Sequence, residues 1–507
     1  MRNIRQIWTK RMLAAAVALT LSAAAGGVSM AEAAETAVGE AAVTPTATDA
    51  VSTAVLAEAA ADAVVPPEII APVAAPIQEV TGIAKTYGDG AFVDWAVVRY
   101  AATINPTSVT PGDFSVAGQT IDDVRVGTTA EVPETSSVGR YVFLKLHHEN
   151  TAKDGVLRGG PKREAAAPTA TPSMPTDTAA TTMSSHDAQP AGEEPGMGIM
   201  RADRTVPDLS FTVRQVGTLF TADGRTYAPS TQAVAAARVV NPVLSAFTQQ
   251  VYDDEALAAS MPYNLFLPAG YDGTQLYPLV IFIPDASANI NDVTTPLFQG
   301  NGATVFADPS WQKDHPCIVL ALQYTDDLVT QLGMMTTDKN EWTQGLELAW
   351  NTIQHVAQTY AVDPNRIYGT GQSQGGMANI AIADRHPDFF AAQYLVACQW
   401  KTDEMAALKD SHLWITVCDG DTKAYPGMNE ATALWKSLGT QVTQNIDPWN
   451  NKAPITVLNR AVRKQAAQGA PINYTVFADG NHMYTWSFAY HIDAIREWMF
   501  QQENRKS

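Results

Sequence analysis

Apolar positions follow two different patterns, and the change between them falls near residue 240. From about 78 to 235, short segments rich in Val, Phe and Tyr are separated by Gly, Pro and Asp, without a helical period. This pattern is typical of β-strands. The expected strands are 91–100, 113–118, 122–127, 140–146 and 209–220. We therefore expect a small all-β sandwich over residues 78–235.

From about residue 240 onwards, strand patterns alternate with helical patterns. Residues 278–284 are a continuous apolar run, as expected for a strand that is covered on both faces. Regular alternation of strands and helices predicts a mostly parallel, doubly wound sheet of the α/β class over residues 240–507. The other expected strands are 263–268, 317–322, 366–369, 391–398, 413–418 and 472–478, and the clearest helices are 342–360 and 488–500.

Two stretches have a composition too simple to form a core. Residues 34–77 consist largely of Ala, Val, Thr, Pro and Glu, and residues 150–204 have a similar bias. Such segments bury too little apolar surface to offset the entropy of ordering them. We expect a linker at 34–77 and a disordered insert at about 150–204, between two strands of the sandwich.

The first 33 residues resemble an export signal. Four basic residues lie within the first eleven, an apolar stretch covers residues 12–25, and small residues surround Ala31 and Ala33. This order is typical of a cleaved secretory signal. An uncleaved membrane anchor is the alternative, although the apolar stretch is shorter than the roughly 20 residues that a spanning helix requires. We expect a protein without a transmembrane domain after cleavage, either secreted or in the periplasm or cell envelope.

Composition and charge narrow the classes of partner. The chain has 507 residues, 46% of them hydrophobic, and a formal net charge of −19. This balance suits a soluble globular protein and argues against a nucleic-acid partner, which requires a basic surface. The three cysteines, Cys317, Cys398 and Cys418, form no C-x-x-C pair, so we predict neither a metal site nor a cofactor. Buried free thiols are expected, with a Cys398–Cys418 bridge as the alternative.

Residues 371–375, with the sequence Gly-Gln-Ser-Gln-Gly, carry the strongest chemical signal. A short expected strand precedes them and a helix follows directly. In that context G-x-S-x-G predicts a sharp turn with the serine hydroxyl at its tip. Glycine is needed at 371 and 375 because a Cβ there would collide with the neighbouring strand and helix. Ser373 is the predicted nucleophile, and the alternative is a glycine-rich structural turn.

A serine hydroxyl near neutral pH needs a histidine base that a carboxylate orients. In this architecture the acid and then the histidine should follow the serine, each after the carboxyl end of a strand. His482, after the strand at 472–478, meets this condition, whereas His491 is expected inside the last helix. Asp421 is the favoured acid because it stands far enough past the strand at 413–418 to turn back. Asp419 remains the alternative.

Two backbone N–H groups should stabilise the negative oxygen of a tetrahedral intermediate. The amide of Gln374 is one candidate, since it begins the helix after the serine and the helix dipole assists it. The second should come from the loop after the strand at 278–284, and we favour the amide of Ala286.

Together these segments resemble secreted α/β-hydrolase esterases with an N-terminal Ig-like domain, a group also described as predicted peptidases or polyhydroxybutyrate-depolymerase-like esterases. The resemblance rests on "YNLFLPAGYDGTQLYPLVIFIPDA", "RIYGTGQSQGGMANIAIADRHPDFFAA", "CDGDTKAYPGM" and "DGNHMYTW", and on "VRQVGTLFTADG" for the Ig-like part. It implies an α/β-hydrolase domain after an Ig-like sandwich, with Ser373, Asp421 and His482 as nucleophile, acid and base.

One segment departs from that family. Its members usually have His-Gly or His-Asp after the third strand, whereas this chain has Pro284-Asp285. Backbone amides perform the oxyanion role, so the change affects the geometry of the loop and the rate more than the class of reaction. Gln374 stands where methionine is common, which leaves the backbone amide in place.

The resulting hypothesis is a serine carboxylesterase without a cofactor, acting on a small-molecule or polymer ester. A serine peptidase with the same triad is one alternative, and a decayed, surface-binding hydrolase is another. Association with the cell envelope is a further expectation, because the two long low-complexity stretches suit display of a domain at a surface. Four aromatic residues are expected near the site, either lining a pocket or packing in the core: Trp400, Tyr425, Tyr484 and Trp486.

Overall fold

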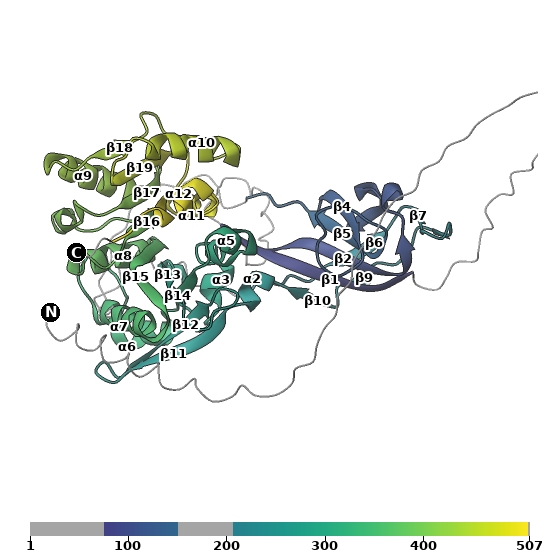
Figure 1. Cartoon of the computed structure of the whole chain (residues 1–507), viewed down its shortest axis with the longest axis horizontal. Coiled ribbons are helices and arrows are strands. Elements are labelled where there is room, and N and C mark those ends of the chain that lie inside the picture. Colours follow the sequence, from purple (N-terminus) through teal and green to yellow (C-terminus); the bar gives the residue numbers. More distant parts are fainter. Residues whose placement is uncertain (1–75, 151–205, 505–507) are drawn as a thin grey trace, which may run out of the picture. The chain divides into compact units, whose positions relative to one another are not determined.

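The computed structural model of the protein describes residues 76–150 and 206–504 (Figure 1). The predicted signal segment, nearly all of the predicted linker and nearly all of the predicted insert lie outside these residues. Their structure therefore stays a prediction.

The described part of the sandwich consists of three β-sheets. A five-stranded sheet has the order β10-β1-β2-β5-β4, a three-stranded sheet has the order β3-β6-β9, and β7 pairs with β8. The strands are β1 (Ile77–Tyr87), β2 (Gly90–Ile104), β3 (Phe114–Val116), β4 (Ile121–Gly127), β5 (Gly139–Leu146), β6 (Thr212–Gln215), β7 (Leu219–Phe220), β8 (Thr226–Tyr227), β9 (Val234–Ala235) and β10 (Arg238–Val240). Two short 3₁₀ helices, η1 (Pro106–Ser108) and η2 (Pro111–Asp113), connect β2 to β3.

One apolar core joins these sheets. Val98 and Val142, from the five-stranded sheet, share a buried cluster with Val213 of β6 and with Leu219 and Tyr227 of the small hairpin. The expected strands at 91–100, 113–118, 122–127 and 140–146 all coincide with observed strands. Each of these strands contributes buried apolar side chains to this core, which explains their content of Val, Phe and Tyr.

The sandwich differs from the sequence-based expectation in several features. The short strands β8, β9 and β10 were not predicted, and β10 extends the five-stranded sheet beyond the expected boundary at residue 235. Strand β1 was not predicted, because it begins at the end of a low-complexity stretch and contains Gly82 and Lys85 among its apolar residues. The expected strand at 209–220 is two short strands, β6 and β7, in different sheets. The chain turns between them at Gly217, whose amide donates to the carbonyl of Asp113 (3.0 Å).

The second part is a nine-stranded sheet with α-helices on both faces, the α/β-hydrolase architecture (Figure 1). Its order is β11-β12-β14-β13-β15-β16-β17-β19-β18, with antiparallel pairing at β11-β12 and β12-β14 and parallel pairing elsewhere. The strands are β11 (Thr248–Asp254), β12 (Ala259–Phe266), β13 (Tyr277–Ile283), β14 (Ile318–Leu322), β15 (Val362–Gln372), β16 (Ala392–Val396), β17 (Leu413–Cys418), β18 (Val442–Gln444) and β19 (Ile472–Phe477).

Alternating side chains of each central strand enter two separate cores. In β13, Leu279, Ile281 and Ile283 belong to one buried cluster, whereas Val280 and Phe282 belong to the cluster on the opposite face. Because successive side chains of a strand point to opposite faces, a strand buried on both sides must be apolar throughout. The continuous run at 278–284 is explained in this way.

The helices divide between the two faces. Buried side chains of α6, α7, α8, α9 and η6 contribute to the first cluster, and those of α3, α4, α5, α10, α11 and α12 contribute to the second. The helices are α2 (Pro242–Ser245), η5 (Ala286–Ala288), α3 (Thr295–Phe298), α4 (Thr304–Ala307), α5 (Pro309–Asp314), α6 (Asp326–Leu332), α7 (Gln344–Thr359), α8 (Gln374–Arg385), η6 (Glu404–Leu408), α9 (Ala424–Ser437), α10 (Ile455–Ala466), α11 (His482–Ala489) and α12 (Asp493–Phe500).

The expected helix at 488–500 is in fact two helices. Helix α11 ends at Ala489 and α12 begins at Asp493, so His491 lies in the break between them rather than inside a helix. The side chain of Asn459 accepts a hydrogen bond from the amide of Ala494 in the first turn of α12 (3.1 Å). This contact comes from α10, so a residue distant in the sequence helps to set the boundary.

The cysteines are buried free thiols, as predicted, and no bridge joins Cys398 to Cys418. Burial raises the pKa of the Cys317 and Cys418 thiols to about 12, because a thiolate would lose its hydration there. Among residues 76–150 and 206–504, no helix combines the length and apolar character needed to cross a bilayer.

Candidate active site

The turn at residues 371–375, here called the nucleophile elbow, joins β15 directly to α8. Ser373 has φ 50° and ψ −121°, a left-handed conformation that L-residues rarely adopt. Its amide donates to the carbonyl of Val396 in the adjacent strand β16 (3.1 Å). The elbow therefore has the strained geometry predicted from the sequence, and Ser373 is partly exposed at its tip.

Both flanking glycines are explained by the backbone of the neighbouring strand β13. A Cβ at Gly375 would lie 1.8 Å from the carbonyl oxygen of Ile283 and 2.7 Å from that of Pro284. A Cβ at Gly371 would lie 2.5 Å from the same oxygen of Ile283. Real Cβ atoms essentially never come this close to backbone atoms, so any larger residue would push the elbow and β13 apart.

The structure brings together the three side chains predicted for the triad. The Nε2 atom of His482 lies 2.8 Å from Oγ of Ser373, and its Nδ1 atom lies 2.6 Å from Oδ2 of Asp421. They come from three separate segments, which follow β15, β17 and β19, and His482 is the first residue of α11. Parallel strands place their carboxyl ends at one edge of a sheet, so residues 109 positions apart meet there.

The loop after β17 holds the Asp421 carboxylate in a nearly dry position, with 2% of the residue exposed. Its Oδ1 atom accepts hydrogen bonds from the amides of Lys423 (3.0 Å) and Ala424 (2.9 Å), while Oδ2 faces the imidazole. Burial alone would raise the pKa of this carboxyl, but the hydrogen bonds from His482, Ala424 and Lys423 outweigh it and hold the pKa below its usual value.

The alternative acid, Asp419, has a hydrogen-bond partner other than His482. It is exposed, and its Oδ1 atom accepts a hydrogen bond from the amide of Asp479 (3.0 Å). This contact links the loops after β17 and β19, so Asp419 has a structural partner of its own.

The two amides predicted for the oxyanion site belong to the first residues of two helical segments, one of which begins within the elbow. Gln374 is the first residue of α8, and Ala286 is the first residue of η5. The first N–H groups of a helix have no partner inside it and are free to bind an anion. Ala286 is partly exposed although Asp285 and Ser287 beside it are buried. These positions are compatible with the predicted role.

The four aromatic residues near the site differ in their surroundings. The ring of Trp486 lies edge-on to that of His482, with centroids 5.2 Å apart. Trp400 and Tyr484 are buried and donate to Glu404 (2.9 Å) and Asn451 (3.1 Å), respectively. Tyr425 is partly exposed. Trp400, Tyr484 and Trp486 are all packed in the apolar clusters, and Trp486 also contacts the imidazole.

The loop after β13 also contains a buried polar group, Asp285, which stands where the family usually has a glycine or an aspartate. Asp285 is 1% exposed and hydrogen-bonds to Gln299 and to Gln372 of the elbow. Nothing in the local sequence places Gln299 beside Asp285, so only the fold could reveal this network.

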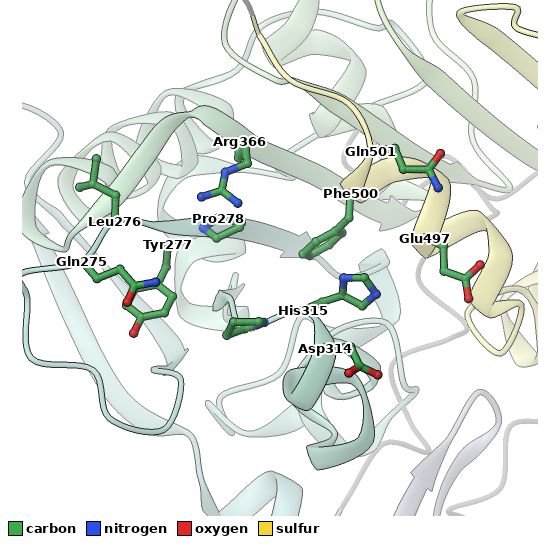
Figure 2. Close-up of a pocket in the computed structure, with 11 residues that line it drawn as sticks. Gln275, Leu276, Tyr277, Pro278, Asp314, His315, Arg366, Glu497, Phe500 and Gln501 are labelled. Carbon is green, nitrogen blue, oxygen red and sulfur yellow. The ribbon is translucent and has the colours of Figure 1, made fainter.

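A cavity of about 410 Å³ lies at the opposite edge of the sheet (Figure 2). Its lining includes Tyr277, the first residue of β13, together with Arg366 near the start of β15 and His315. Because Ser373 follows the carboxyl end of β15, this cavity is separated from the triad by the length of the strands.

Two segments match known protein families. Residues 79–228 match the esterase Ig-like N-terminal domain, and residues 344–442 match the prolyl oligopeptidase family. No curated protein gives a significant match over the chain.

Solved structures with a similar fold include several esterases. A thermostable esterase is 21% identical, with a TM-score of 0.59, over 84% of this chain and 100% of its own. The feruloyl esterase module from Clostridium thermocellum is 14% identical, with a TM-score of 0.36, over 50% of this chain and 87% of its own. A ferulic acid esterase is 12% identical, with a TM-score of 0.34, over 50% of this chain and 98% of its own. The first of these similarities supports the fold.

The contact between the elbow and β13 can be tested by adding one methyl group. Gly375→Ala should destabilise the protein by about 1–3 kcal/mol, because a Cβ 1.8 Å from the oxygen of Ile283 forces backbone to move. Gly112→Ala is the control, since the nearest atom to a Cβ there is 3.7 Å away. Chemical denaturation followed by circular dichroism measures both. Equal stability of the two variants would contradict the close approach.

The elbow, the strand order and the matched segments lead to the same class of protein. A partly exposed serine stands between a parallel strand and a helix, within hydrogen-bonding distance of a histidine. An Ig-like segment precedes this domain. The chain is therefore a serine hydrolase that combines an Ig-like N-terminal domain with a catalytic domain of the α/β-hydrolase fold.

Proposed function

We propose that the protein hydrolyses carboxylic esters, with Ser373 as nucleophile, His482 as general base and Asp421 as the acid that orients the histidine. The main support is the continuous chain of hydrogen bonds from Asp421 through both ring nitrogens of His482 to the hydroxyl of Ser373. A serine that gives its proton to a histidine, which a carboxylate orients in this way, becomes a nucleophile near neutral pH.

In the acylation step, Oγ of Ser373 attacks the ester carbonyl carbon while Nε2 of His482 takes its proton. The Asp421 carboxylate, next to Nδ1, stabilises the imidazolium that forms. The amides of Gln374 and Ala286 donate to the negative oxygen of the tetrahedral intermediate. The imidazolium then gives its proton to the departing alcohol, which leaves an acyl-enzyme on Ser373.

Deacylation repeats these steps with water. His482 takes a proton from the water as the water oxygen attacks the acyl carbon. Collapse of the second intermediate releases the acid and returns the proton to Oγ of Ser373. All of the proton transfers use one imidazole, so the mechanism requires no cofactor.

The matches favour an ester as the scissile bond. The segment at 79–228 matches a domain described from esterases, and the thermostable esterase shares the fold over its whole length. The match of residues 344–442 to the prolyl oligopeptidase family points instead to a peptide bond. Both bonds are cleaved by the same attack and the same oxyanion contacts, so substrates must discriminate between them.

Paired ester and amide substrates provide the test. We expect p-nitrophenyl esters of graded chain length to be hydrolysed and the matching peptide anilides to remain uncleaved at equal enzyme concentration. Turnover of anilides without turnover of any ester would replace the esterase proposal by the peptidase alternative. Ser373→Ala should abolish both ester turnover and labelling by a fluorophosphonate probe. The control Ser437→Ala, at an exposed position of α9, should retain both, and an unlabelled wild type would indicate a decayed site.

The contact between Asp421 and His482 predicts a loss of activity when the carboxylate is removed. Asp421→Asn presents an amide to Nδ1 of His482 and favours the wrong tautomer, so kcat should fall by roughly 10³–10⁴-fold.

The lowered pKa of Asp421 also predicts a pH dependence of stability. The carboxylate stabilises the folded protein above its unfolded-state pKa, and this effect is lost as the pH falls through the folded-state pKa. The difference in unfolding free energy between wild type and variant should therefore shrink from pH 6 towards pH 2. A constant difference over that range would exclude a stabilised carboxylate.

We also propose that the protein is exported and then released or retained at the cell envelope. The support is the basic, apolar and small-residue order of residues 1–33. Expression of the full chain with its tag at the C-terminus, followed by N-terminal sequencing of the exported product, should identify a first residue just after Ala31 or Ala33. An intact N-terminus in a cytoplasmic product would contradict export.

A further inference from the structure

Residues 285–289, here called the oxyanion loop, follow β13 and carry the proposed oxyanion donor Ala286. We propose that Asp285 is a positioning residue that fixes this loop against the nucleophile elbow and so sets the geometry of the oxyanion site. The inference rests on the proposed function, because it assigns a role within the same reaction. Asp285 itself contacts neither the nucleophile nor the histidine through the bonds described below.

The Asp285 carboxylate is buried and accepts hydrogen bonds at both oxygens. Oδ1 accepts from the amide of Ser287 (2.9 Å) and from its hydroxyl. Oδ2 accepts from Nε2 of Gln299 (2.7 Å) and from Nε2 of Gln372 (3.2 Å). A carboxylate has about four acceptor sites, and these four donors match that capacity. Buried polar groups satisfied in this way make a rigid unit.

The contact with Gln372 links the loop to the catalytic serine. Gln372 is the last residue of β15 and directly precedes Ser373. Its own Oε1 atom accepts a hydrogen bond from the hydroxyl of Tyr490 (3.0 Å), and Tyr490 is fully buried. The orientation of the Gln372 amide is thus set from both ends. Movement of Asp285 would disturb the residue next to the nucleophile.

The Asp285 side chain also determines which amide stays available to a substrate. As the N-cap of η5, it binds the N–H of Ser287, the second residue of that helix. The N–H of Ala286, the first residue, is left for an external acceptor. Binding the second amide and fixing the loop position together restrict the orientation of the first amide. Oxyanion donors act by being held in place before charge develops.

A second aspartate in the same chain makes the local hydrogen bonds of Asp285 without its contacts to the elbow. Asp292, a few residues further on, accepts hydrogen bonds from the amide (2.8 Å) and hydroxyl (2.7 Å) of Thr294. These bonds match those between Asp285 and Ser287, but Asp292 is only partly buried and its bonds remain within its own turn. Asp285 adds the two buried contacts with Gln299 and Gln372. Asp292→Asn is therefore a matched control for Asp285→Asn.

The experiment compares these two variants in the full-length protein. In Asp285→Asn an amide replaces one carboxylate oxygen, so N–H groups face N–H groups of Ser287 or of the two glutamines. We expect kcat for a p-nitrophenyl ester to fall by about 10–100-fold. Complete loss of an oxyanion donor lowers kcat by about 10²–10³-fold, so the expected effect is smaller. KM should stay within about twofold, and Asp292→Asn should keep kcat within about threefold.

A second readout addresses the tetrahedral state directly. A trifluoromethyl ketone forms a tetrahedral adduct with the serine and places a negative oxygen in the oxyanion site. Its affinity should weaken in Asp285→Asn by a factor similar to the fall in kcat, since both depend on the same donors. Unchanged kcat and unchanged ketone affinity would overturn the proposal. A rise in KM with constant kcat would also overturn it, because it indicates a role in ground-state binding.

Circular dichroism melting identifies a variant that fails to fold. In that case Tyr490→Phe and Gln372→Met, which each break one link of the network, decide instead. We expect each to lower kcat by about 3–10-fold with constant KM, and wild-type kcat in both would overturn the proposal. A wild-type protein without serine-dependent labelling and without ester turnover would refute the proposed function itself, which is a different result from normal catalysis in Asp285→Asn.

Discussion

The close approach of two backbone segments, the end of β13 and the nucleophile elbow, is the constraint on which the rest of the site depends. The carbonyl oxygen of Ile283 occupies the space where a side chain at 371 or 375 would begin. This contact brings the loop after β13 next to the residues that flank Ser373. The strained serine, the proposed donor position of Ala286 and the buried Asp285 network all require that distance to be short. Glycine is therefore required at both positions for the elbow to approach β13 this closely.

Much of the candidate site was predictable because parallel sheets convert sequence order into spatial position. The expected strands at 366–369, 413–418 and 472–478 are all present, and the loops after them carry Ser373, Asp421 and His482. A continuous apolar run identifies a buried parallel strand, and its carboxyl end identifies the edge where loops converge. Every residue of β13 is buried, alternately in one cluster and the other, which shows why such runs contain so few polar residues.

Features that depend on distant contacts were not predictable. Strand β1 is stabilised by pairing with β2 and β10, although its own sequence resembles the linker before it. The break between α11 and α12 falls in a stretch whose apolar residues continue on both sides. The distant partners of Asp285 are Gln299, directly after α3, and Gln372 of β15, and Gln372 is itself bound by Tyr490 directly after α11. No spacing rule connects these residues. Local patterns record which face of an element is buried, but not which side chain of another element meets it.

The Pro284-Asp285 departure gains a physical interpretation from this network. In an oxyanion loop the backbone supplies the donors, so the side chains serve to fix the backbone rather than to react. Proline at 284 limits the backbone torsions of the loop, and the carboxylate at 285 adds four hydrogen bonds that bind it to its surroundings. A buried carboxylate is costly unless such donors surround it, and their presence shows that the neighbouring residues suit this particular side chain. Under the proposed function, this network would hold the loop in place by side chains other than the histidine that is usual in the family.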